Sequence, residues 1–225
     1  MELCLADLSD RREITRLWMQ AFGDTGEAVE FFFRSFPDCR SYVARIRGQV
    51  VSMVHATERI LTPDRRAAYL YAVATDSDFR GQGLCRRLMA FAEADLQARG
   101  FDCCVLRPGS EDLFRFYERL GYKTAFFRSH KTFSGGGPVS AAEYARLREQ
   151  VLTVPHTVCD ENLLNYASSV YGLTFYRTGA GCSAAAPGYT AECLPEDVGG
   201  DPDAMVKWLT EPRSLTGAYL GFALE

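Results

Sequence analysis

The stretch FRGQGLCRR, residues 79–87, places two glycines among three arginines where a strand-like run meets a helix-like run. A helix N-terminus carries unpaired backbone amides and a partial positive charge, so it attracts anions. Gly81 and Gly83 have no Cβ to hold a phosphate away from these amides. Arg80, Arg86 and Arg87 add charge, and the guanidinium fork matches phosphate oxygens. The stretch therefore predicts a site for a diphosphate.

Other interpretations compete for the same stretch. A Walker-type loop requires Gly-Lys followed by Ser or Thr, which is absent here. A dinucleotide fingerprint requires a third glycine where Arg86 stands. A flexible glycine turn with solvated arginines is the structural alternative, and use of the loop for ATP is the runner-up among enzymes.

The bulk composition is that of an ordinary soluble globular protein, with 225 residues, 47% hydrophobic and 24% charged. This length permits one large domain or two smaller ones. The net charge of −4 provides no overall attraction for nucleic acid or an anionic membrane, so neither is an expected partner. Residues 1–7 have acid where a signal peptide needs base, and no apolar run is long enough for a membrane span. We expect a cytoplasmic protein.

The cysteines and histidines do not predict a metal site. The eight cysteines include no C-x-x-C pair, and Cys103 and Cys104 are adjacent, which suits neither a zinc site nor a disulfide framework. We expect reduced, mostly buried thiols. His130 and His156 have no sequence partners that suggest metal ligation. No metal is predicted.

The hydrophobic pattern of the first 133 residues alternates between helical and strand-like periods. Helical spacing follows Asp10 up to Gly23, and again in a second segment that ends before Pro37. Strands are expected at residues 2–8, 41–46, 50–61, 67–75, 101–107 and 122–133. Two further helices are expected, one from residue 84 to its stop at Gly100 and one over residues 110–121. The three strands between 41 and 75 are expected to form an antiparallel meander.

The remaining residues repeat the same order of elements after the linker-like run SGGGPV, residues 134–139. Helices are expected at 141–152 and 161–172, and strands at 173–178, 181–186, 189–194 and 218–225. This order suggests a diverged internal duplication. The counterpart of the glycine loop, PEDVGGDPDAM at 195–205, carries acids where arginines would be needed, so like charges would repel a diphosphate there.

Residues 70–89, LYAVATDSDFRGQGLCRRLM, resemble motif A of the GNAT superfamily of acyl-CoA-dependent N-acyltransferases, R/Q-x-x-G-x-G/A after the fourth strand. Arg80, Gly81 and Gly83 fit in order, and Cys85 stands where the family usually has Gly or Ala. Residues 109–123, GSEDLFRFYERLGYK, are similar to the family's N-x-x-A-x-x-x-Y-x-x-x-G-[FY], with Ser110 at the Asn and Tyr117 at the Tyr. The whole chain looks most like the tandem-repeat branch that contains the enhanced-intracellular-survival acetyltransferases.

This resemblance implies an α/β (α+β) fold with a GNAT-like mixed, mostly antiparallel central sheet flanked by helices. A shortened, degenerate GNAT-like second unit would follow. The expected domains are an acyl-CoA-binding domain at 1–133, a linker at 134–139, and a degenerate domain without a CoA site at 140–225.

The resemblance also implies the residues of an acetyl-CoA site. The backbone of Val73, Ala74 and Thr75 would hold the pantetheine arm, with an N–H facing the thioester oxygen. The residues expected to contact this acyl donor are Val73, Ala74, Thr75, Arg80, Gly81, Gln82, Gly83, Leu84, Cys85 and Ser110.

Tyr117 is the expected general acid, which would protonate the departing CoA thiolate. A phenol of pKa ~10 is protonated at neutral pH, and a thiolate of pKa ~8.5 needs only modest help. The alternative is that Tyr117 packs in a core near Leu113 and Leu120. The general base stays open among Glu58, Asp24, His55 and Glu225, because a solvated charge, or for His55 a satisfied buried imidazole, explains each of them better than a catalytic role.

The sequence therefore predicts an N-acetyltransferase that moves an acetyl group from acetyl-CoA to a primary amine of a small molecule or peptide. The alternative from another class is a non-catalytic CoA-binding sensor or interaction module. The sequence leaves the acceptor and the oligomeric state open, and a homo-oligomer is one option.

Overall fold

The computed structural model describes residues 1–213, 215 and 217–221, and the chain forms two compact units. The first contains Met1–Glu58, Arg66–Leu106 and Trp208–Glu211. The second contains Arg59–Arg65, Arg107–Lys207 and the described residues from Pro212 on. The domain boundaries expected from the sequence stay a prediction.

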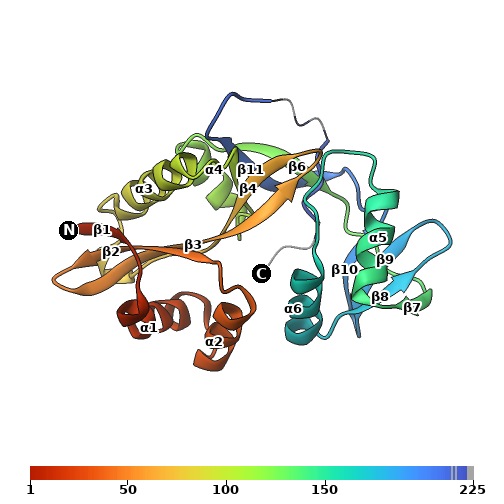
Figure 1. Ribbon diagram of the computed structural model, residues 1–225, viewed down its shortest axis with the longest axis horizontal. Coiled ribbons are helices and arrows are strands. Elements are labelled where there is room, and N and C mark those ends of the chain that lie inside the picture. Colours follow the sequence, from red (N-terminus) through yellow and green to blue (C-terminus); the bar gives the residue numbers. More distant parts are fainter. Residues whose placement is uncertain (214, 216, 222–225) are drawn as a thin grey trace. The chain divides into compact units, whose positions relative to one another are not determined.

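The first unit is a sheet with helices on both faces (Figure 1). Its strands are β1 (Glu2–Leu5), β2 (Arg40–Ile46), β3 (Gln49–Leu61), β4 (Arg65–Thr75) and β5 (Cys103–Leu106), in that spatial order. β2 runs antiparallel to β1 and β3, whereas β5 runs parallel to β4. Helices α1 (Arg11–Phe22) and α2 (Gly26–Ser35) cover one face, and α3 (Leu84–Ala98) covers the other.

The helices of this unit form where the apolar spacing predicts them. Leu17 and Trp18 of α1 are buried, and so is Phe32 of α2, because the 3.6-residue period places them toward the sheet. Phe22, the last residue of α1, is 49% exposed. Gly23 ends α1 in a left-handed conformation.

The second unit contains a strand pair and a small separate sheet. β6 (Lys123–Arg128) pairs antiparallel with β11 (Asp201–Trp208), and β7 (Gly137–Val139), β8 (Thr174–Arg177), β9 (Cys182–Ala186) and β10 (Tyr189–Leu194) form the sheet β10-β9-β8-β7. Its helices are α4 (Glu111–Glu118), α5 (Ala141–Val151) and α6 (Glu161–Tyr171).

Three parts of this unit differ from the sequence-based elements. β7 lies inside the run expected to be a linker, where it pairs with β8. β11 occupies part of the run interpreted as an acidic loop, because its pairing with β6 supplies backbone hydrogen bonds that local composition does not reveal. Ala218 and Tyr219 of the expected terminal strand form isolated bridges, and its residues from 222 on lie outside the described chain.

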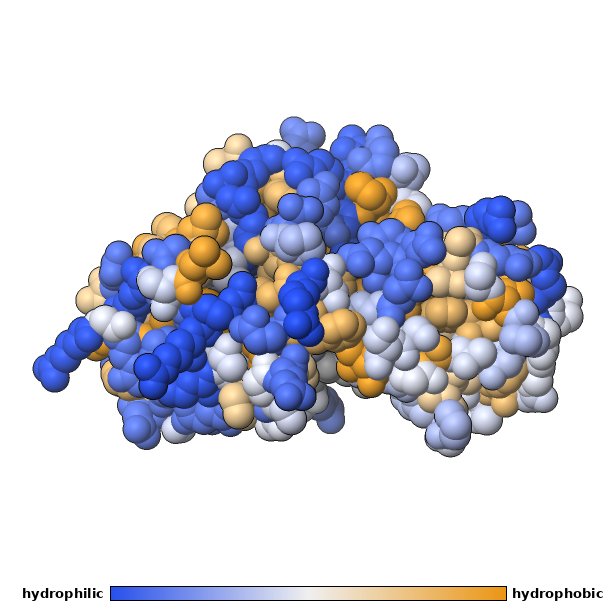
Figure 2. Space-filling model, turned by 60° about the horizontal axis from the view of Figure 1, so that its bottom comes forward, coloured by the Kyte–Doolittle hydropathy of each residue, from blue (hydrophilic) through white to orange (hydrophobic). Residues whose placement is uncertain are grey.

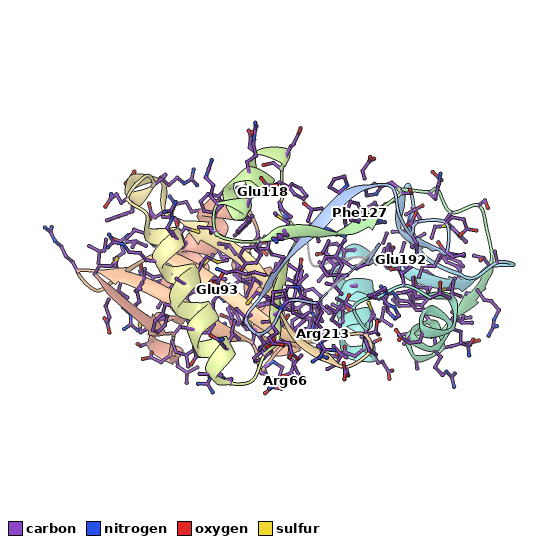
Figure 3. The ribbon with its side chains drawn as sticks, turned by 90° about the horizontal axis from the view of Figure 1, so that it is seen from above. Arg66, Glu93, Glu118, Phe127, Glu192 and Arg213 are labelled. Carbon is purple, nitrogen blue, oxygen red and sulfur yellow. The ribbon has the colours of Figure 1, made fainter. Side chains whose placement is uncertain are left out.

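A buried ion pair fixes the core of the second unit. Arg148 Nε lies 3.1 Å from Glu192 Oε2, and both side chains are fully buried. Tyr144 donates its hydroxyl to Glu192 at 2.6 Å, and Arg148 Nη1 donates to the carbonyl of Thr157 at 2.6 Å. Buried charges are stable only when paired and hydrogen-bonded, so this network ties α5 to β10, on which Glu192 lies (Figure 3).

The surface is mixed in polarity, and the cysteines, all of which the structure describes, form no disulfide. Figure 2 shows hydrophilic residues over much of one face, with hydrophobic patches between them. Four of the eight cysteines are buried, namely Cys103, Cys104, Cys159 and Cys182. None of the helices within the described residues is long and apolar enough to cross a membrane.

Candidate active site

The glycine loop joins β4 to α3 at one end of the first unit's sheet. Gly81 and Gly83 have φ of +75° and +73°, a region that residues with a Cβ rarely adopt. An added Cβ at either position would meet nothing within 4 Å. The glycines are therefore required by the backbone conformation, and the space beside them is open.

The first turn of α3 presents its backbone amides to this open space. Gly83 is the N-cap and offers no side chain, and the amides of Leu84, Cys85 and Arg86 donate to no group within the described residues. Residues 80–83 are exposed, as are Arg86 and Arg87. Neither of these two arginines forms an ion pair with any described residue. The arrangement has the free donors and the positive charge that a diphosphate requires.

Side chains at the end of β4 hold the loop in place. Arg80 Nε donates to the carbonyl of Thr75 at 3.1 Å, so Arg80 braces the loop as well as adding charge. Asp76 caps the turn at Ser77–Phe79 and pairs with Arg16 Nη1 of α1 at 3.1 Å. The arginine neutralises a carboxylate that would otherwise repel an anion. Sequence reasoning missed Arg16 and Asp76, although the D-S-D run signals a capped turn.

β4 contains a left-handed residue just before the residues expected to hold pantetheine. Ala72 has a φ of +48°, which costs a residue with a Cβ roughly 1–2 kcal/mol. Within the described residues, the pairing of β4 with β5 extends from Ala67 to Tyr69 and no further. The edge of residues 73–75 that faces β5 is therefore free of strand pairing. Nothing in the sequence signals a left-handed alanine.

Contacts with β3 fix the other edge of the same segment. Ser52 Oγ donates to the carbonyl of Ala74 at 2.9 Å and lies 2.8 Å from Thr75 Oγ1. The amide of Asp76 donates to the carbonyl of Val51 at 2.9 Å. The end of β4 thus has one edge fixed and one edge free.

Cys85 follows the loop in the first turn of α3. Burial raises the pKa of its thiol to about 11, so the side chain stays protonated and neutral. Its amide belongs to the free first turn.

Tyr117 and Ser110 belong to the second unit. Tyr117 of α4 is 6% exposed, and its ring lies 5.1 Å from that of Phe116 and 5.8 Å from that of Tyr122. Leu113, an expected core neighbour, is 38% exposed. Ser110 is the exposed N-cap of α4, and its side chain makes no capping hydrogen bond.

The general-base candidates differ in their surroundings. Glu58 accepts two hydrogen bonds of 2.9 Å from Arg66, which lower its pKa and make it a weak base. Asp24 accepts the indole N–H of Trp18 at 2.7 Å. Glu225 lies outside the described residues.

His55 is fully buried in an aromatic cluster, with Nδ1 2.8 Å from Ser41 Oγ. Burial, and secondarily the charge of Arg11, lower its pKa to about 3. The imidazole is therefore neutral at physiological pH and has no access to solvent. Neither feature favours His55 as a base that exchanges protons with an amine.

His55 should make the protein less stable in mild acid. In the unfolded chain its pKa is ~6.5, so between pH 6.5 and 3 only the unfolded state binds this proton. Stability is therefore lost as pH falls, by about 2 kcal/mol between pH 7 and 5. Urea unfolding should show that His55→Gln reduces this loss by that amount, whereas His130→Gln, at an exposed histidine, retains it. An equal loss in His55→Gln and the unchanged protein would refute the assignment.

The matching family is described as acetyltransferase (GNAT) domain, and its model covers residues 4–125, more than half of the chain. The chain belongs to the GNAT acetyltransferase family. This confirms the resemblance on which the sequence-based family assignment rests. No curated protein sequence matches.

Solved structures show the same fold. A GCN5-related N-acetyltransferase from Kribbella flavida has a TM-score of 0.66 at 17% identity, over 92% of this chain and 72% of that one. A probable N-acyltransferase from Enterococcus faecalis V583 has a TM-score of 0.62 at 21% identity, and the match covers 84% of this chain and 56% of that one. Eis1 from Mycobacterium abscessus has a TM-score of 0.63 at 12% identity, and the match covers 82% of this chain and 53% of that one. The chain thus spans about half the length of the last two, and the mixed, mostly antiparallel GNAT fold is confirmed.

Proposed function

We propose that this GNAT protein is an acetyl-CoA-dependent N-acetyltransferase that acts on a primary amine of a small molecule or peptide. The observation that carries the proposal is the exposed loop at residues 80–83 with the first turn of α3 that follows it. There the free first-turn amides of α3, two left-handed glycines, and Arg86 and Arg87, which pair with no carboxylate of the described residues, gather beside the end of β4. Acetyl-CoA supplies an activated acetyl group and a pyrophosphate that this loop would hold.

Each part of the site has a distinct task in the proposed reaction. The amides of Leu84, Cys85 and Arg86 bind the pyrophosphate, together with the charge of Arg87 and Arg80. Gly81, Gln82 and Gly83 let the ligand approach the backbone. The free edge of residues 73–75 pairs with the amide groups of pantetheine, and one of its N–H groups stabilises the oxyanion. Ser110, in the second unit, is proposed as a further cofactor contact.

The chemical step replaces a C–S bond with a C–N bond. The neutral amine attacks the thioester carbonyl, and the resulting tetrahedral oxyanion collapses and expels the thiolate. Tyr117 donates its phenolic proton to that thiolate, and the nitrogen loses its own proton to a base. A phenol is suited to this role because it is protonated at neutral pH.

Release of CoA thiol in the presence of acetyl-CoA and a panel of primary amines tests the function. We expect amine-dependent release, detected with a disulfide reagent. Protein without acetyl-CoA is the necessary control, because the chain's own partly exposed thiols, at Cys4, Cys39, Cys85 and Cys193, can react with the reagent. Background release with every amine, together with a melting temperature that CoA still raises, would instead establish the non-catalytic binding module. A melting temperature that rises with ATP but not with CoA would establish the alternative in which the loop binds ATP in a nucleotide-dependent transferase.

A further inference from the structure

A hollow of about 800 Å³ opens in the first unit, away from the glycine loop. It is lined by the starts of α1, β2 and β4, the ends of β1, α2 and β3, and the turn between α3 and β5. None of its residues lies between 67 and 98, so it shares none with the loop. Along β3, Glu58 in its wall is six residues from Ser52 at the loop end, or roughly 20 Å.

The wall of this hollow has one more positive than negative side chain. Its charged residues are Arg11, Arg40, Arg66 and Arg99 against Asp7, Asp38 and Glu58. Both carboxylate oxygens of Glu58 accept hydrogen bonds from the guanidinium of Arg66. Arg66, labelled in Figure 3, also donates to the carbonyl of Arg99 near the C-terminal end of α3. Asp95, outside the hollow, pairs with Arg99 at 2.8 Å.

Of the four arginines in the wall, Arg11 is the one that pairs with no carboxylate of the described residues. Its guanidinium lies 3.4 Å from the ring centroid of Phe33, and its Nη1 is buried without a hydrogen-bond partner in the described chain. The positive charge of Arg11 acts on neighbouring groups, since it contributes to the lowered pKa of His55. Arg40 is only partly compensated: its Nε is 3.5 Å from Asp95 and makes no hydrogen bond to a described residue.

The rest of the wall includes aromatic and aliphatic side chains. Phe33, Phe36 and Ile14 line one part, and Phe101, over whose ring the Arg66 guanidinium lies at 4.3 Å, lines another. A concave site of roughly 300–1,000 Å³ with aromatic walls and a few convergent polar groups is typical of small-molecule binding. An unpaired arginine on an aromatic ring is suited to fix a carboxylate.

We propose that this hollow binds a small organic monocarboxylate with an apolar or aromatic body, whose carboxylate pairs with Arg11. The apolar body lies against Phe33, Phe36 and Phe101, and Arg40 adds a second attraction. A monoanion fits the uncompensated charge of Arg11, whereas a second negative charge would be repelled by Asp38. The site is separate from the acetyl-CoA loop and does not depend on the proposed function.

Calorimetry and saturation-transfer NMR with 3-phenylpropionate and its neutral amide, 3-phenylpropionamide, test the proposal at low ionic strength. The acid should bind at least about tenfold tighter than the amide, because a charge-assisted pair contributes more than a neutral hydrogen bond. Arg11→Gln should remove that preference. Arg12→Gln, at the exposed neighbour that does not line the hollow, should keep it.

A melting curve will show whether Arg11→Gln folds. If it does not, the comparison of acid and amide binding to the unchanged protein still tests the proposal. Absence of saturable acid binding at millimolar concentration, or equal binding of acid and amide, would overturn the proposal. Equal effects of Arg11→Gln and Arg12→Gln would also overturn it. A CoA-induced rise in melting temperature, measured on each variant, reports the acetyl-CoA site independently.

Discussion

Gly83→Asp is expected to weaken CoA binding by at least about 100-fold. The change places a carboxylate beside the free amides of Leu84 and Cys85, where it would repel the pyrophosphate and cap the helix itself. Loss of several charge-assisted hydrogen bonds, each contributing about 1.5–3 kcal/mol, accounts for the size of the effect. Isothermal titration of CoA into the folded variant measures it directly.

Gly48→Asp is the matched control for this experiment. Gly48, in the turn between β2 and β3, has a φ of +82° and nothing within 4 Å of an added Cβ, as at Gly83. Both variants therefore carry the same backbone strain and the same added charge, but only one lies at the loop. Similar CoA affinities for the two variants would contradict the assigned role of the loop. Gly83→Asn separates the effect of the charge from that of the side chain.

Tyr117→Phe is expected to lower kcat by about 100-fold or more while leaving CoA affinity within a few-fold. A positioned general acid typically contributes 10²–10⁴ to the rate, and the phenyl ring preserves the packing against Phe116 and Tyr122. The measurement is thiol release at saturating amine, with CoA affinity determined separately.

Tyr122→Phe provides the comparison, because Tyr122 is a second buried phenol 5.8 Å from Tyr117 in ring centroids. Its turnover should stay near that of the unchanged protein. An unchanged kcat in Tyr117→Phe would remove Tyr117 from the mechanism. An equal loss in both variants would show that the phenols act through packing instead.

Local sequence patterns predicted most elements of both units. The apolar period gave α1 and α3 nearly to the residue, since Asp10, Gly23 and Gly100 mark their ends chemically. The glycine loop was predictable for the same reason, because left-handed glycines before a helix leave a strong local signal. The resemblance to the family motif then indicated acetyl-CoA as the ligand, whereas the local sequence pattern alone predicted only a diphosphate.

Features set by contacts between distant residues were not predictable. Arg16 and Asp76 are sixty residues apart in sequence, and the pairing of β11 with β6 joins segments still further apart. The left-handed Ala72 results from its surroundings in the fold and not from its own preference. The hollow around Arg11 is likewise assembled from five separate stretches of backbone, none of which carries a motif.

The central claim is that main-chain amides at the start of α3 bind the pyrophosphate of CoA. Calorimetry with CoA and with pantetheine, which has the same arm but neither the phosphates nor the adenosine, tests it most directly, and Gly83→Asp separates the loss of the phosphate contacts from the loss of the adenosine. We expect CoA to bind saturably and pantetheine at least about 100-fold more weakly, because each charge-assisted contact contributes about 1.5–3 kcal/mol. Equal affinities, or no heat of CoA binding to folded protein, would contradict the account.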